Sequence, residues 1–245
     1  MPRILLLGGT SEAAEMARIL ARAGLWAVYS YAGRTQSPVA QPLPLRVGGF
    51  GGVDGLRAYL AREAITHVID ATHPFAAQMS RNAIAACRAQ GVALCGFERL
   101  PWVAQTGDRW TSVPDMEAAA SALPIEARRV FLAIGRQHIG LFGAVPQHHY
   151  LLRLVDPPTL PLPVPDCRVV LARGPFLEDE DLALLQEHRI DLVVAKNAGG
   201  TGARAKIDAA RRLGLPVLMI ERPETGARLV FHAAEDVMGW LGHGL

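Results

Sequence analysis

The chain has 245 residues, of which 50% are hydrophobic and 20% are charged, and its formal net charge is +2. The composition is that of an ordinary globular protein. The small charge, without long runs of lysine or arginine, argues against nucleic acid as the main partner of the protein. The three cysteines lack C-x-x-C spacing, and neither a signal-like N-terminus nor an apolar stretch of bilayer-spanning length is present, so we expect a cytoplasmic protein without disulfides or a membrane partner.

The first element combines a strand, a glycine turn and a helix. Ile4–Leu7 is a short apolar run, Gly8-Gly9 turns the backbone, and Thr10 or Ser11 can cap the helix that follows. The amides and the dipole of such a helix N-terminus favour an anion, and glycine lets a pyrophosphate approach the backbone. The full G-x-G-x-x-G fingerprint is missing, so the turn alone predicts either a phosphate site or a bare connection.

The second strand, Trp26–Tyr31, leads to Arg34. In dinucleotide-binding folds an acidic residue near this point binds the ribose 2′-hydroxyl, whereas an arginine accommodates a 2′-phosphate. No aspartate or glutamate lies between Glu15 and Asp54. If a dinucleotide binds, the sequence therefore favours NADPH over NADH; the alternative is a solvated loop arginine.

The third strand, His67–Ala71, ends in polar residues. Asp70, Thr72 and His73 lie at its carboxyl end, where open α/β sheets bind ligands. His73 is a candidate proton or hydrogen-bond donor, although Asp70 and Thr72 would equally well cap the helix expected over Phe75–Gln90. Upstream, the glycine-rich loop Gly48–Gly52 either admits a ligand or is merely flexible.

The remaining strands and helices are expected in chain order. A fourth strand over Val92–Phe97 and a possible fifth over Arg109–Val113 complete a first domain at residues 1–118. Five further apolar runs, separated in part by helical segments, predict a second domain at residues 119–245: Val130–Ile134, Tyr150–Leu154, Val169–Ala172, Leu192–Ala195 and Val217–Ile220. The fold class is α/β, with two Rossmann-like domains that each contain a mainly parallel sheet flanked by helices.

Each of the five later strands has a cation at its end or just beyond it. If their sheet is parallel, these cations share one edge, which would suit a ligand with several carboxylates; the alternative is that they keep the strand ends soluble. The cations are Arg136, Arg153, Arg173, Lys196 and Arg222. Lys196 begins a second strand–glycine–helix sequence that includes Asn197, Gly199 and Gly200.

Eight motifs in this order resemble the precorrin-6A reductase family of cobalamin biosynthesis. They are Leu7–Glu12, Ala32–Thr35, Gly48–Gly52, Asp70–Ala76, Ile134–Gln137, Gly174–Phe176, Lys196–Gly200 and Gly214–Val217. The resemblance spans essentially the whole chain. It implies an NADPH-dependent reduction of one macrocycle double bond, from precorrin-6A to precorrin-6B, without a metal or a flavin. Cobalt-precorrin-6A of the anaerobic route is an alternative substrate.

The motifs and positions together nominate site residues. For the cofactor these are Gly8, Gly9, Thr10, Ser11, Glu12, Arg34 and Thr72. For a polycarboxylate tetrapyrrole they are Gly49, Phe50, Arg136, Arg153, Arg173, Lys196, Asn197, Gly199, Gly200 and Arg222. His73 and Lys196 are the candidate proton donors, with solvent as the alternative source. We expect a monomer. The rival to an enzyme is a protein that binds NADP or a tetrapyrrole without turnover.

Overall fold

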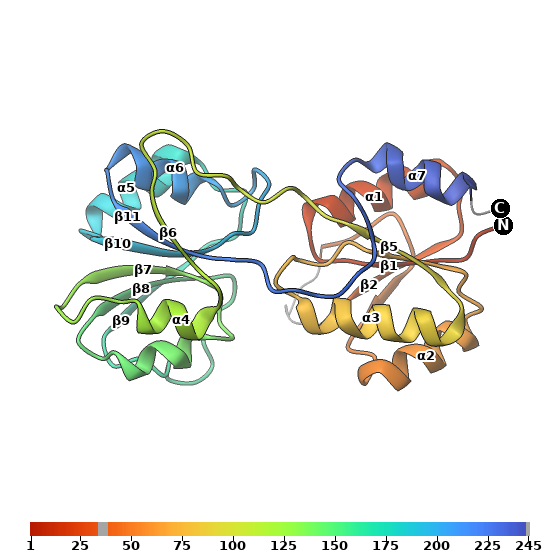
Figure 1. Cartoon of the computed structure of the whole chain (residues 1–245), viewed down its shortest axis with the longest axis horizontal. Coiled ribbons are helices and arrows are strands. Elements are labelled where there is room, and N and C mark those ends of the chain that lie inside the picture. Colours follow the sequence, from red (N-terminus) through yellow and green to blue (C-terminus); the bar gives the residue numbers. More distant parts are fainter. Residues whose placement is uncertain (34–38, 244–245) are drawn as a thin grey trace. The chain divides into compact units, whose positions relative to one another are not determined.

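The computed structural model describes residues 1–33 and 39–243 and divides into two compact units. The first unit contains Met1–Leu100 and Glu224–Leu245, and the second contains Pro101–Pro223. Each unit is a parallel sheet with helices on both faces, which confirms the predicted α/β class (Figure 1). Within the described residues, no helix is long and apolar enough to cross a bilayer.

The first unit is a six-stranded parallel sheet in the order β12-β5-β4-β1-β2-β3. The strands are β1 (Ile4–Leu7), β2 (Ala27–Tyr31), β3 (Leu45–Val47), β4 (His67–Asp70), β5 (Ala93–Phe97) and β12 (Leu229–Phe231). The direction in which successive strands are added reverses between β1 and β4. This order is that of a dinucleotide-binding sheet, whose ligands bind beyond the carboxyl ends of the strands at the reversal.

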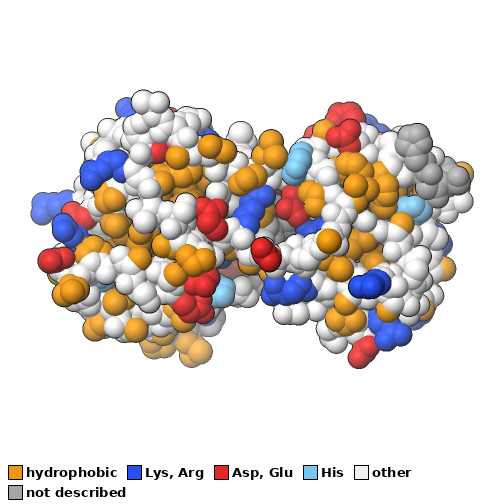
Figure 2. All heavy atoms as spheres, in the orientation of Figure 1, with side chains coloured by type: hydrophobic (Ala, Val, Ile, Leu, Met, Phe, Trp, Pro, Cys, Tyr) orange, Lys and Arg blue, Asp and Glu red, His pale blue; other side chains and the backbone are white. Residues whose placement is uncertain are grey.

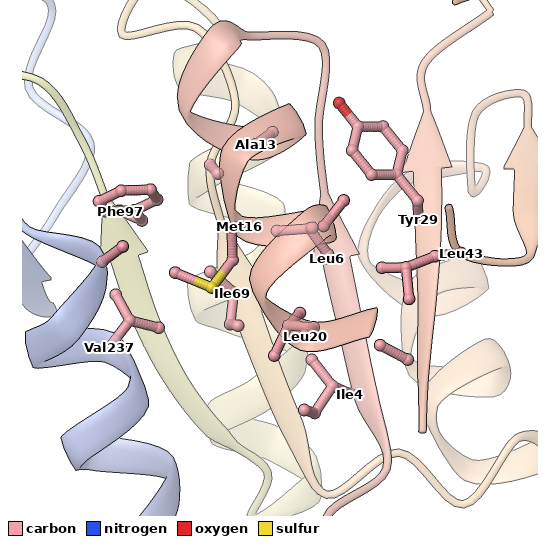
Figure 3. Close-up of a cluster of buried hydrophobic side chains, with 14 of the residues drawn as sticks. Ile4, Leu6, Ala13, Met16, Leu20, Tyr29, Leu43, Ile69, Phe97 and Val237 are labelled. Carbon is pink, nitrogen blue, oxygen red and sulfur yellow. The ribbon is translucent and has the colours of Figure 1, made fainter. Parts of the chain in front are cut away.

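Successive side chains of β1 point to opposite faces of this sheet, and helices cover both faces. Ile4 and Leu6 belong to a core cluster with residues of α1 (Ser11–Arg22) and α7 (Ala234–His243), as Figure 3 shows. Leu5 and Leu7 point to the opposite face, where they pack with residues of α2 (Gly52–Arg62) and α3 (Ala77–Gln90). A strand buried on both faces has no polar side, which is why β1 reads as a continuous apolar run.

The second unit is also a six-stranded parallel sheet, in the order β6-β11-β10-β7-β8-β9. The strands are β6 (Arg109–Val113), β7 (Arg129–Ala133), β8 (His149–Leu154), β9 (Cys167–Leu171), β10 (Leu192–Lys196) and β11 (Pro216–Ile220). On one face α5 (Glu178–Glu187) and α6 (Ala205–Arg212) contribute to a core with Phe131 and Val193. The other helical elements are α4 (Met116–Ser121) and the 3-10 helix η1 (Ile139–Ala144), which pack against one another.

Two strands join a different sheet from the strand that precedes them. β6 follows β5 in the chain but pairs with β11, and β12 follows β11 but pairs with β5. The expected placement of Arg109–Val113 in the first domain is therefore wrong, and the units differ from the expected division at residues 118 and 119. Local apolar patterns predict a strand but not its partner, because the pairing is made by distant segments.

The third expected helix begins later than predicted, at Ala77 rather than Phe75. The Phe75 amide donates to Nδ1 of His73 at 3.1 Å, and the Ala76 amide donates to the His73 carbonyl at 2.7 Å. These bonds close a tight turn over residues 73–76, so the helix starts only after it.

Candidate active site

The glycine turn after β1 lies at the point where the first sheet reverses its strand order. Thr10 caps α1, because its Oγ1 accepts a hydrogen bond from the Ala13 amide at 3.1 Å. The same hydroxyl donates to the Ala71 carbonyl at 2.8 Å. Thr10 therefore ties the turn after β1 to the turn after β4, and the two loops that border a nucleotide site in this topology form one connected structure.

Tyr29, which the sequence pattern did not single out, supports the glycine turn after β1 through its side chain. Its buried hydroxyl accepts a hydrogen bond from the Gly9 amide at 2.9 Å. A Cβ at Gly8 would overlap the Tyr29 ring, whereas a Cβ at Gly9 would meet nothing within 4 Å, although Gly9 has a φ of +118°. Burial raises the pKa of the Tyr29 hydroxyl. Gly8 is thus required by packing and Gly9 by backbone conformation, and open space lies beside Gly9.

The first turn of α1 carries a carboxylate that is already paired. Glu12 lies 3.1 Å from Nη1 of Arg99, and both side chains are mostly buried. Ser11 donates to the same carboxylate at 3.1 Å. Arg99 neutralises a charge that would otherwise repel an anion at the helix N-terminus.

Asp70 orders the turn after β4. Its carboxylate is 1% exposed, and Oδ1 accepts from the Thr72 amide at 3.2 Å and from the Thr72 hydroxyl at 2.7 Å. Arg228, from the segment that returns to the first unit, lies 3.4 Å from Oδ2 of Asp70 and also pairs with Glu98. Asp70 is therefore a structural anchor, and Thr72 is held by it.

His73 has a defined hydrogen-bonding state. Its Nδ1 accepts the bond from the Phe75 amide, so the hydrogen of the neutral ring lies on Nε2. His73 is half-buried at the carboxyl edge of β4. The ring can thus donate a hydrogen bond from Nε2 at the edge where the sequence placed a proton donor.

The glycine loop before α2 is braced by Arg46. Its guanidinium donates to the Gly49 carbonyl at 2.8 Å and lies 3.7 Å from the centroid of the Phe50 ring. Phe50 also meets Tyr59 edge-on, at 5.2 Å between ring centroids. Phe50 is thus packed into its own unit. Arg34, the residue predicted to select the cofactor, lies outside the described residues.

The strand ends that carry the predicted cations share one edge of the second sheet, because all six strands are parallel. Arg173 and Arg136 are exposed there, and Arg136 donates to the Thr159 hydroxyl at 3.4 Å. On the face that Figure 2 shows, basic and acidic side chains are interspersed.

Arg153 differs from the expected exposed cation. Its side chain is 9% exposed and pairs through both terminal nitrogens with Asp181, which is 3% exposed. The guanidinium also stacks on Phe176, at 3.7 Å from the ring centroid. A strand of this length alternates its side chains, and position 153 points into the layer under α5. The charge of Arg153 is therefore neutralised by Asp181 in the interior of the second unit.

Asn197 is likewise engaged within its own unit. Its amide brackets the backbone of Trp102, accepting from the Trp102 nitrogen at 2.8 Å and donating to the Trp102 carbonyl at 3.1 Å. Arg222 donates to the carbonyls of Asn197 and Ala198 at 3.0 and 3.1 Å. Gly199 and Gly200 both have positive φ, at +71° and +67°. Lys196 is half-buried at the end of β10.

Comparisons with known proteins agree with this fold. The family described as "Precorrin-6x reductase CbiJ/CobK" matches residues 3–242. A precorrin-6A reductase of Rhodobacter capsulatus is 64% identical over 245 residues, covering 100% of this chain and 98% of that protein. A precorrin-6A reductase of Sinorhizobium sp. is 48% identical, covering 100% and 94%. The solved structure of "CobK precorrin-6A reductase" has a TM-score of 0.96 at 64% identity, covering 99% of this chain and 97% of that one. The chain therefore belongs to the precorrin-6x reductase CbiJ/CobK family.

Proposed function

We propose that this protein reduces precorrin-6A to precorrin-6B with NADPH, as a step of cobalamin biosynthesis. The observation that carries the proposal is the 64% identity to a protein named precorrin-6A reductase over essentially the full length of both chains. At that similarity the reaction is expected to be shared.

The turn after β1 fits a dinucleotide. Space is open beside Gly9, α1 presents its N-terminus there, and Arg99 neutralises the nearby Glu12. In the proposal, Gly8, Gly9, Thr10 and Ser11 hold the pyrophosphate, and Thr72 borders it from the neighbouring turn. When bound, NADPH supplies the hydride.

The chain itself must supply position and a proton. Lys196 carries an ammonium group that can donate a proton to the carbon next to the one that receives the hydride. The neutral His73 ring can only donate a hydrogen bond from Nε2, and it becomes a proton donor when Nδ1 is also protonated, which breaks the bond from the Phe75 amide. Solvent is the alternative proton source. Arg136, Arg173 and Lys196 are the cations proposed to pair with substrate carboxylates.

Arg34 is proposed to bind the 2′-phosphate that distinguishes NADPH from NADH. A charge-assisted arginine–phosphate contact contributes about 1.5–3 kcal/mol. We therefore expect Arg34→Ala to raise the KM for NADPH by about 10- to 100-fold, measured with saturating precorrin-6A, and the KM for NADH far less. Arg18→Ala, which removes an exposed arginine from α1, is the matched control. Equal effects on both cofactors would exclude Arg34 from the 2′-phosphate site.

The reaction is tested with purified protein, authentic precorrin-6A and NADPH carrying deuterium at the transferred position. We expect consumption of NADPH only when the precursor is present, a change in its visible spectrum, and one deuterium in the product by mass spectrometry. Cobalt-precorrin-6A is assayed in parallel to distinguish the two routes. Binding of NADPH and precursor without turnover would support the non-catalytic alternative instead.

A further inference from the structure

The loop between β10 and α6, residues 197–204, has its carbonyl groups held by side chains. Arg222 binds the carbonyls of Asn197 and Ala198, at 3.0 and 3.1 Å. Trp102 donates from Nε1 to the Gly200 carbonyl at 2.7 Å, and Lys206 donates from Nζ to the Ala203 carbonyl. Four carbonyls of one short loop are thus bound by two cations and an indole.

The backbone amides of the same loop, unlike its carbonyls, are without partners among the described residues over several consecutive positions. In the described part of the chain, the amides of consecutive residues from Gly199 to Ala203 donate no hydrogen bond to a protein group. Gly199 is itself buried. Gly200, Gly202 and Ala203 are half-buried and Thr201 is exposed, so a ligand can reach these amides, and neighbouring amides without protein partners form a concentration of positive partial charge. The loop is therefore polarised, with its acceptors satisfied and its donors available.

The hydrogen bonds between Asn197 and the backbone of Trp102 explain how the loop carbonyls are kept in place. Trp102 is buried in the core of the second unit, and its backbone is fixed by the Asn197 amide on both sides. The ammonium group of Lys206 lies 5.1 Å from the centroid of the indole ring. Trp102 can therefore hold the Gly200 carbonyl without moving, because its own position is determined by three separate contacts.

We propose that Trp102 and Arg222 are positioning residues, which turn the carbonyls of residues 197–204 inward so that the amides of Gly199–Ala203 bind a carboxylate of the tetrapyrrole substrate. This inference rests on the proposed function. In this proposal Asn197 and Arg222 do not bind the substrate directly. Asn197 holds the backbone of Trp102, Arg222 holds two carbonyls of the loop, and the loop amides contact the substrate.

The experiment compares two tryptophan-to-phenylalanine variants of the full-length protein. Trp102→Phe keeps an aromatic ring in the core but removes the bond to the Gly200 carbonyl. Trp110→Phe is the matched control, because Trp110 packs against the same core and its Nε1 has no hydrogen-bond partner in the described structure. The loss of one neutral hydrogen bond corresponds to about a 2- to 10-fold change in an equilibrium.

For Trp102→Phe we expect the KM for precorrin-6A to rise about 2- to 10-fold, with kcat and the KM for NADPH unchanged. Trp110→Phe should leave all three parameters unchanged. Arg222→Lys keeps a charge but cannot bridge two carbonyls in the same way, so it should reproduce the selective rise in KM and keep the proposal testable if Trp102→Phe does not fold. The same KM for precorrin-6A in Trp102→Phe, Trp110→Phe and wild type would overturn the inference, as would a parallel rise in both KM values. Failure of the wild-type protein to reduce precorrin-6A would instead refute the proposed function, and the assignment of the loop to this substrate with it.

Discussion

Asp181→Ala is expected to lower the free energy of unfolding by about 3–5 kcal/mol, because it leaves the guanidinium of Arg153 buried without a counter-charge. The pair is almost completely buried, and Arg153 is enclosed further by the ring of Phe176. Urea unfolding followed by circular dichroism measures the change.

The matched control is Asp179→Ala on the same helix. The Asp179 side chain is 88% exposed, and its contact with Arg212, at 2.8 Å, is a surface ion pair. Such pairs contribute about 1 kcal/mol or less. A loss for Asp181→Ala no larger than that for Asp179→Ala would show that the Arg153–Asp181 pair is not buried in solution.

A double replacement separates the structural role of Arg153 from the substrate role that the sequence suggested. Removing both charges, as in Arg153→Met with Asp181→Leu, avoids the unpaired cation and should restore most of the stability that Asp181→Ala loses. Because Arg153 is occupied within its unit, the double variant should also retain the wild-type KM for precorrin-6A. A strong rise in that KM, in a protein that is stably folded, would return Arg153 to the substrate site.

The sequence predicts much of the fold because the signals are local. An apolar run such as Ile4–Leu7, followed by glycines and a helical repeat, identifies a βα unit without reference to the rest of the chain. The strand β12 was not predicted, and neither was the sheet that β6 joins; each of these strands pairs with a strand that lies far away in the sequence. Which sheet such a strand joins depends on packing between distant segments, and the pattern of a single strand does not contain that information.

The candidate site shows the same division. Thr10 and Thr72 were found from their positions near strand ends, and the structure places them in the two turns at the reversal of the first sheet. Tyr29 and Trp102 were missed because buried aromatic residues look like ordinary core. Their polar atoms become informative only when their acceptors or donors, at Gly9 and Gly200, are known. Arg153 illustrates the converse error, since a cation at a strand end looks exposed until its partner on α5 is placed.

Gly8→Ala is expected to reduce both stability and cofactor binding. The new methyl group would overlap the end of the Tyr29 ring, which is fully buried and cannot swing away without disturbing the core around Leu6 and Met16. Overpacking of this kind costs about 1–3 kcal/mol. The turn must shift to relieve it, so we expect NADPH to bind at least about tenfold more weakly, since tenfold corresponds to about 1.4 kcal/mol. Thermal unfolding and calorimetric titration with NADPH measure the two effects.

Two further variants decide whether Tyr29 is the cause. Gly239→Ala is the control, because Gly239 lies in α7 with nothing within 4 Å of the methyl group that alanine would add, and there alanine should stabilise the helix by about 0.5–1 kcal/mol. Gly8→Ala combined with Tyr29→Leu removes the overlap and should recover part of the lost stability, although the hydrogen bond from the Gly9 amide to the tyrosine hydroxyl is absent. If the double variant recovers stability but not NADPH affinity, the Tyr29 hydroxyl is itself needed to shape the turn. If it recovers neither, the defect of Gly8→Ala arises from the backbone of the turn, and the contact with Tyr29 is not its cause.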